Sequence, residues 1–175
     1  MTAPPPWALR TIKVIDTVSE WSGRMVAWLI VPLMVALSYE VIMRYGFDAP
    51  TTWAYDTSYY VYGTHFMLGA AYTLLKKGHI RTDFLYEKWP IKKQATIDAA
   101  AYLFLFFPGI FFFFFASWDQ AWHSFLIGER SEASAWQPII WPFKMVIPVT
   151  AVLLFAQGVS EFIKSVHTMR TGRTL

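Results

Sequence analysis

Three charged residues, Glu40, Arg44 and Asp56, lie near the ends of two long apolar stretches. Glu40 and Arg44 are four residues apart, so on a helix they share one face, and acid before base is the favourable order. Asp56 falls in the first turn expected for the next helix, where the helix dipole favours a carboxylate. The group is either an ion or substrate site, or an ion-pair cluster that ties a hairpin together or binds a partner. None of the three lies in the middle of an apolar stretch, which favours the second interpretation.

Histidine and aspartate supply two further candidates. His65 is an ionisable residue within an apolar stretch, which is a functional hypothesis by default in a membrane, although a neutral imidazole bonded to a neighbouring helix is commoner. Asp119 and His123 are four residues apart, but two ligands do not complete a metal site, and a helix-end hydrogen bond is the favoured alternative. His79 and His167 lie outside the apolar stretches, so no second histidine can face His65 for bis-histidine haem ligation. We therefore expect no metal and no cofactor.

Four apolar stretches position these residues: 25–43, 57–75, 99–118 and 139–160. Each has about the 20 residues that a helix needs to cross the hydrocarbon core of a bilayer. The 175-residue chain is 55% hydrophobic and 15% charged, whereas soluble domains carry about 25% charged residues. The sequence therefore predicts an all-α integral membrane protein with four transmembrane helices, and one membrane domain over residues 1–175.

Local signals refine these spans. Residues 50–52 indicate a helix start and residues 76–78, two lysines and a glycine, a helix stop. Pro108 and Gly109 predict a kink in the third span, and Lys144 is close enough to the interface to extend its amine towards water. Gly69 belongs to a cluster of small residues in the second span that permits close helix packing, within the chain or with a partner; the others are Ala70, Ala71 and Thr73.

Two segments are expected to lie on the membrane surface. Residues 7–22 predict a short amphipathic helix, because apolar and charged side chains each recur at helical spacing: Leu9, Ile12, Ile15 and Val18 against Arg10, Lys13, Asp16 and Glu20. The connection over residues 78–93 mixes aromatic and charged residues and is broken by Pro90. The N-terminus lacks the short apolar core and cleavage site of a signal peptide, so we expect it to be retained.

The basic residues predict the orientation, because lysine and arginine gather on the cytoplasmic side. Twelve of the fifteen lie on one side of a four-span arrangement: Arg10, Lys13, Arg24, Lys76, Lys77, Arg81, Lys88, Lys92, Lys93, Lys164, Arg170 and Arg173. Arg44, Arg130 and Lys144 lie on the other. Both termini are therefore expected in the cytoplasm, and the basic loop requires no nucleic-acid partner. The chain has no cysteine, and no nucleophile motif, phosphate-binding loop or paired-carboxylate site is evident, so we expect no enzyme.

The motifs together resemble one transporter family. The residues that carry the resemblance are Glu40-Val-Ile-Met-Arg44-Tyr45, then Trp53 and Asp56, then Leu68-Gly69-Ala70-Ala71, then Gly78-His79-Ile80-Arg81-Thr82-Asp83. This pattern is similar to that of the small, DctQ-like membrane subunit of TRAP (tripartite ATP-independent periplasmic) transporters. The match is dense from residue 40 to 90 and looser towards the C-terminus. Asp56 stands where the family usually has glutamate.

The resemblance implies a non-catalytic subunit in a bacterial inner membrane. Its partners would be a large permease subunit, a periplasmic substrate-binding protein and membrane lipid, and the complex would import an organic acid with a sodium gradient. Eight residues are then candidates for structural or subunit-interface roles: Glu40, Arg44, Trp53, Asp56, Gly69, His79, Arg81 and Asp83. Arg81 either binds lipid phosphate or, with Asp83, contacts the large subunit. The rivals are a small homo-oligomeric transporter, which needs a deeply embedded acid, and a membrane cytochrome subunit, which the histidine positions disfavour.

Overall fold

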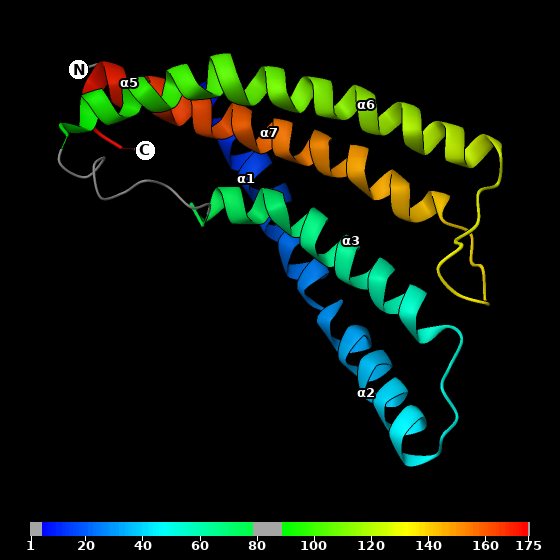
Figure 1. Cartoon of the computed structure of the whole chain (residues 1–175). Helices are drawn as coiled ribbons and strands as arrows, with labels where there is room; N and C mark the ends of the chain where they lie inside the picture. The colour runs from blue at the N-terminus through cyan, green and yellow to red at the C-terminus, as the bar shows by residue number, and fades with distance from the viewer. Residues whose placement is uncertain (1–4, 79–88, 175) are drawn as a thin grey trace.

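The computed structural model describes residues 5–78 and 89–174, and these residues are almost entirely helical (Figure 1). The helices are α1 (Pro6–Ala27), α2 (Ile30–Gly46), α3 (Ala54–Leu75), α5 (Ile91–Ala101), the π-helix η1 (Tyr102–Phe106), α6 (Phe107–Leu126) and α7 (Trp141–Thr171). The described residues form no strand beyond an isolated antiparallel bridge between Arg130 and Ile139. The predicted all-α fold is therefore confirmed.

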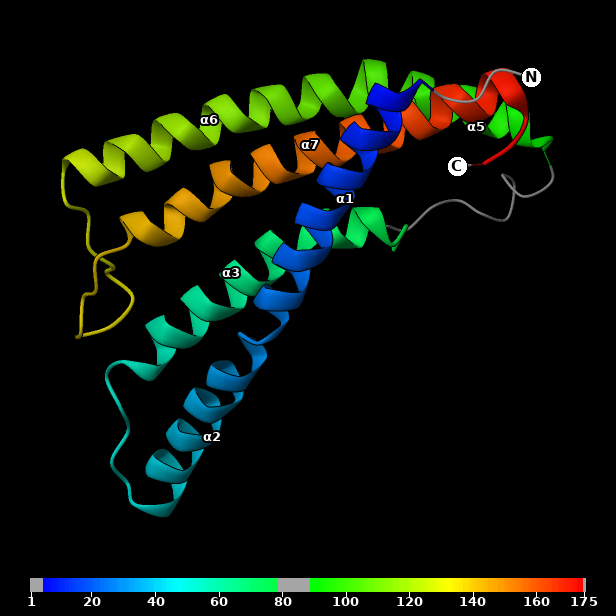
Figure 2. The ribbon, with the colours of Figure 1, turned by 180° about the vertical axis from the view of Figure 1, so that it is seen from behind.

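The helices form two arms. In one arm α6 and α7 lie side by side, and in the other α2 and α3 form a hairpin (Figure 1). Helix α3 also packs directly against α7, so α2 is the helix that diverges from the rest. Seen from behind, α1 crosses both α3 and α7 and so joins the arms (Figure 2). The first and last described residues lie at the end where α5 begins (Figures 1 and 2).

Three helical segments of the described chain are long and apolar enough to cross a membrane: Pro6–Gly46, Ile91–Leu126 and Trp141–Thr171. They contain the first, third and fourth predicted spans. The second, residues 57–75, forms the 22-residue helix α3, which is not among these three segments. Five of the nine tyrosines of the chain lie in α3 and make it more polar. The protein thus has the helices of a membrane protein, while the count of four crossings stays a prediction.

The N-terminal helix ends later than predicted. The amphipathic segment is helical as expected, but α1 extends to Ala27 and is separated from α2 only by a short turn at Trp28 and Leu29. The backbone N–H groups of Trp28 and Leu29 still bond to the carbonyls of Met25 and Val26. The amphipathic helix and the first span are therefore separated by a single turn. Pro32 accounts for this turn, because proline has no N–H to bond the carbonyl of Trp28 four residues before it and its ring clashes with that carbonyl.

Near Pro108 and Gly109, where the sequence predicted a kink, the structure has a π-helical turn. Pro108 is the second residue of α6, and the preceding turn, η1, has π-helical hydrogen bonding in which the N–H of Phe107 bonds to the carbonyl of Tyr102. Proline has no N–H, and its ring clashes with the carbonyl four residues before it. A wider π turn upstream of the proline accommodates both.

The fourth span is longer than predicted. Helix α7 runs to Thr171 and ends at Gly172, whose φ of 73° is the left-handed conformation that glycine favours at a helix end. The sequence predicted a span that ends at residue 160. The polar residues that follow continue the helix because α7 packs against α1 and α5.

Close packing at two glycines fixes α3 and α7 against their neighbours. A Cβ at Gly23 would lie 2.4 Å from the Cβ of Tyr72, so only glycine lets α1 approach α3 this closely. A Cβ at Gly158 would lie 2.3 Å from a ring carbon of Phe106, which fixes α7 against η1. Small residues at helix contacts are the usual packing solution in membranes.

Candidate functional site

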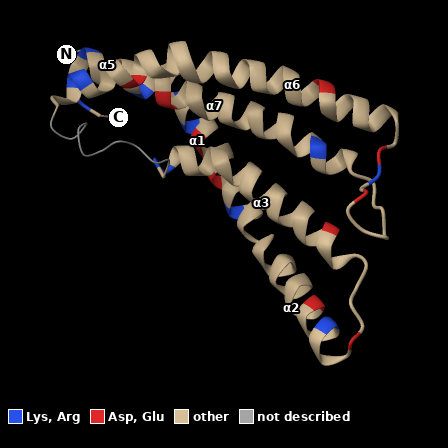
Figure 3. Ribbon diagram, in the orientation of Figure 1, with Lys and Arg blue, Asp and Glu red and all other residues tan. Residues whose placement is uncertain are grey.

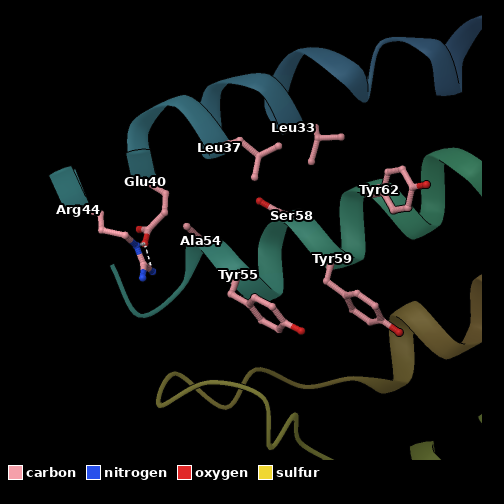
Figure 4. Close-up of a pocket in the computed structure, with 9 residues that line it drawn as sticks. All are labelled: Leu33, Leu37, Glu40, Arg44, Ala54, Tyr55, Ser58, Tyr59 and Tyr62. Atoms are coloured by element: carbon pink, nitrogen blue, oxygen red, sulfur yellow. Dashed lines mark hydrogen bonds and ion pairs between the residues drawn. The ribbon is translucent and has the colours of Figure 1, made fainter. Parts of the chain in front are cut away.

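The predicted pair of Glu40 and Arg44 forms at the C-terminal end of α2. The end of the molecule with the loops 47–53 and 127–140 is called the outer end, after the orientation that the sequence predicts. The Nε of Arg44 donates to Oε1 of Glu40 at 2.8 Å, and its Nη2 bonds to the same oxygen (Figure 4). The other carboxylate oxygen accepts a 3.0 Å bond from the backbone N–H of Thr51 and one from its hydroxyl. Glu40 therefore ties the end of α2 to the loop that leads into α3.

Residues 51–53 precede α3 but do not cap it with a side chain. Helix α3 begins at Ala54. Thr51, one of the three residues that were predicted to mark the helix start, binds Glu40. Trp53 stacks on Tyr39 of α2 with 5.8 Å between ring centroids. Both contacts close the hairpin of α2 and α3 at its outer end.

Asp56 joins the two arms of the molecule. It is only 1% exposed, and its carboxylate accepts a 2.7 Å bond from the hydroxyl of Ser131 and another from Ser134, both in the loop between α6 and α7. The sequence allowed Arg44 as its partner, but the described residues form no ion pair between Asp56 and Arg44. Asp56 is thus a buried acceptor for the second outer loop.

Glu129 and Lys144 brace the same loop. The Nζ of Lys144 donates to Glu129 at 2.5 Å, and this hydrogen bond holds the pKa of Glu129 below its ordinary value. Lys144 lies in the first turn of α7, as expected for a side chain near the interface, but it binds a protein carboxylate. The outer loop is therefore fixed to α3 by Asp56 and to α7 by Lys144.

A second polar cluster lies at the opposite end, between α1 and α7. Asp16 of α1 accepts bonds from Ser160 at 2.7 Å, Gln157 at 3.1 Å and Lys164 at 2.8 Å. Lys164 also donates to Glu161 at 2.7 Å. Gln157 and Ser160 are fully buried, and Glu161 is 5% exposed. We call these five residues the inner cluster.

The inner cluster holds two carboxylates and one lysine, of which Glu161 is buried while the side chains of Asp16 and Lys164 are 26% and 21% exposed. Breaking a fully buried ion pair by removing one partner costs about 3–5 kcal/mol, because the remaining charge is left without compensation, and the cost is lower where water reaches the pair. Removing Lys164 would leave Asp16 and Glu161 together with no cation. The cluster therefore fixes α1 on α7 in one position, and its amide and hydroxyl donors share the charge of Asp16.

His65 makes a contact between helices. Its Nδ1 lies 3.0 Å from the carbonyl oxygen of Val26 in α1. A carbonyl only accepts, so Nδ1 carries the proton and the ring is a neutral or charged donor. This is the structural alternative that the sequence offered, in which the histidine bonds to a neighbouring helix.

The remaining predicted positions show less. Asp119 and His123 are exposed near the outer end of α6, and no group of three acidic or histidine side chains within the described residues is placed to hold a metal ion. A Cβ at Gly69 would meet nothing within 4 Å, so this part of α3 is open to a neighbour. His79, Arg81 and Asp83 lie outside the described residues.

The arrangement separates charges from apolar surface. Figure 3 shows long tan stretches of α6 and α7 without charged residues, whereas α1 carries charges along its length. Such a molecule can span a bilayer and hold its loops in place. Among the described residues, no set of ionisable side chains meets on these uncharged stretches of α6 and α7.

The sequence of the chain was compared with known families and proteins. The family model for tripartite ATP-independent periplasmic transporters, DctQ component, matches residues 33–168. The chain belongs to the DctQ family. It is therefore a small component of a TRAP transporter, a tripartite system in which DctQ proteins work with a large permease and a periplasmic binding protein. None of the curated proteins compared with the chain matches it.

Several of the side-chain contacts in this DctQ protein are not predicted by its sequence. Thr51, Ser131 and Ser134 were missed as carboxylate partners, and so was the pairing of Asp16 with Lys164. Serine and threonine in loops carry no pattern that marks them as partners of a distant acid. Asp16 and Lys164 are 148 residues apart. One signal was available in the sequence: Asp16, Glu161 and Lys164 all fall at the same predicted end of the helices.

We predict that Arg44→Ala reduces recovery of the folded protein more than Arg24→Ala does. The two arginines form matched pairs with a glutamate four residues earlier, Glu40 and Glu20. Glu40 is 15% exposed, whereas Glu20 is 39% exposed and its arginine 73%, and exposed pairs contribute little. The measurement is the monodisperse fraction in detergent after mild heating. Equal losses from both changes would show that the Glu40–Arg44 pair has no special role.

Proposed function

We propose that the chain is the non-catalytic small subunit that braces the large permease subunit and helps to dock the periplasmic binding protein. The complex would import an organic acid with a sodium gradient, across the inner membrane of a bacterium. The chain would cross that membrane four times with both termini in the cytoplasm. Family membership supports the assignment to a TRAP transporter, and the placement of polar groups supports the bracing role.

The observation that carries the bracing role is how the buried polar groups are used. Asp56 and Asp16 bind other parts of the same chain, and each accepts hydrogen bonds from two or more side chains. A transport site usually lies near mid-membrane, between repeats with broken helices. In the described residues the long apolar stretches of α6 and α7 carry no charged group, and His65 is bonded to Val26. The chain is thus suited to a structural role, in which its helices keep fixed positions relative to one another.

Docking of the binding protein is supported by the outer loops. Residues 47–53 and 127–140 are anchored by Glu40, Asp56 and Lys144. A loop fixed in this way presents a constant surface, and preorganised surfaces bind with less loss of conformational entropy. These loops are the proposed contact for the periplasmic partner.

The function is tested by uptake into vesicles made from defined subunits. We expect no uptake of organic acids by vesicles that contain this chain alone. With the large subunit and the binding protein present, a sodium gradient should drive uptake, and omission of this chain should abolish it. Uptake by this chain alone would contradict the proposal and favour the small homo-oligomeric transporter.

The topology is tested with single cysteines, which the cysteine-free chain allows without background. In spheroplasts, an impermeant maleimide should label Ala49→Cys and Ala135→Cys, which lie in the outer loops. Lys93→Cys and Arg173→Cys should be labelled only after the membrane is permeabilised. Ala49 and Lys93 flank α3, so identical labelling at these two positions would show that α3 does not cross the membrane.

A further inference from the structure

The exposed apolar surface of the molecule is of two kinds. On η1 and α6 the most exposed side chains are purely hydrocarbon: Phe104, Leu105 and Phe112, each more than 70% exposed. On α3 the exposed side chains are Tyr55, Tyr59, Tyr62 and Phe66, each more than 50% exposed. Their spacing places all four on one face of α3, which we call the tyrosine face.

The tyrosine face lies between α2 and α7. Tyr59 reaches the ring of Phe143 in α7, with 5.1 Å between centroids. On the other side, the tyrosines border a groove of about 410 Å³ whose far wall is formed by Leu33 and Leu37 of α2 (Figure 4). The groove follows the two helices, and Glu40 and Arg44 stand at its outer end.

Hydrogen bonding distinguishes a lipid from a protein as the neighbour of this face. A hydrocarbon chain satisfies the phenylalanines of α6, but it offers nothing to a hydroxyl, and an unsatisfied polar group in the bilayer core costs several kcal/mol. Tyr62 lies eight residues inside α3, or about 12 Å along the helix axis at 1.5 Å per residue. Tyr55 can reach the headgroups, but Tyr62 is much deeper.

Ser58 adds an independent observation. Its hydroxyl is buried and has no hydrogen-bond partner within the described residues, and Ser58 lines the groove next to Leu37 (Figure 4). Hydroxyl groups that bond across helices are a common feature of helix contacts in membranes. A transmembrane helix with backbone carbonyls or polar side chains on its surface would provide these partners, and its ridge of side chains suits a groove between two helices.

We propose that the tyrosine face and its groove bind a transmembrane helix of the large permease subunit, while the phenylalanine surface of α6 faces lipid. This inference rests on the proposed function for the presence of that subunit. It also explains why α3 is more polar than the three segments that are apolar enough to cross a membrane. In the complex, the tyrosine face of α3 is covered by protein.

Photo-crosslinking in the co-expressed complex tests the assignment with matched aromatic positions. The photoreactive residue p-benzoylphenylalanine is introduced in place of Tyr59, Tyr62 or Phe66, and in place of Phe104 or Phe112 as controls. We expect crosslinks to the large subunit at the three α3 positions, several-fold above those at the two controls. Crosslinks at the controls but not on α3, crosslinks on α3 to lipid alone, or none on α3 would overturn the proposal.

The proposed function is read out separately, by co-purification of the unsubstituted chain with the large subunit. If the two subunits co-purify and the α3 positions do not crosslink, only the assignment of the face is wrong. If they do not co-purify, the proposed function fails as well. A second variant checks the groove: Leu37→Trp should reduce co-purification, whereas Val35→Trp, also exposed on α2, should not. Equal co-purification of both would count against occupation of the groove.

Discussion

A polar group inside a bilayer must find its partner within protein, because the hydrocarbon offers none. The fold of this DctQ protein follows from that constraint. Two of its acids, Asp56 and Asp16, are held by donors from a distant part of the chain. Asp56 binds two serines of another loop, and Asp16 binds a lysine, a serine and an amide of another helix. Hydrophobic burial cannot perform this role, since lipid tails are as apolar as the side chains.

These polar contacts define the geometry of the two arms. At the outer end, Asp56 connects the hairpin of α2 and α3 to the loop between α6 and α7, across 75 residues of sequence. At the opposite end, the inner cluster connects α1 to α7. The glycine contacts Gly23–Tyr72 and Gly158–Phe106 bring the helix backbones close between these points. A subunit fixed at both ends in this way is suited to brace a larger partner.

The sequence predicted what depends on local spacing. Three of the four apolar stretches, the helix stop near Lys77 and the pair of Glu40 and Arg44 follow from residues a few positions apart, and all appear in the structure. The partners of Asp56 and Asp16 depend on tertiary packing, which no local pattern records. The continuation of α7 to Thr171 has the same origin, because polar residues stay helical where another helix covers them. The π turn before Pro108 required knowledge of how the helix accommodates proline.

The central claim is that buried polar contacts within this chain set the angle between its arms. The most direct measurement is the distance between spin labels in the double variant Tyr45→Cys and Leu126→Cys, at the exposed outer ends of α2 and α6. In the otherwise unchanged chain, without other subunits, pulsed electron paramagnetic resonance should give one narrow distance distribution. Addition of Asp56→Ala removes the acceptor of Ser131 and Ser134 and should broaden it. A broad distribution in the unchanged background, or a narrow one that Asp56→Ala leaves unaltered, would contradict the account.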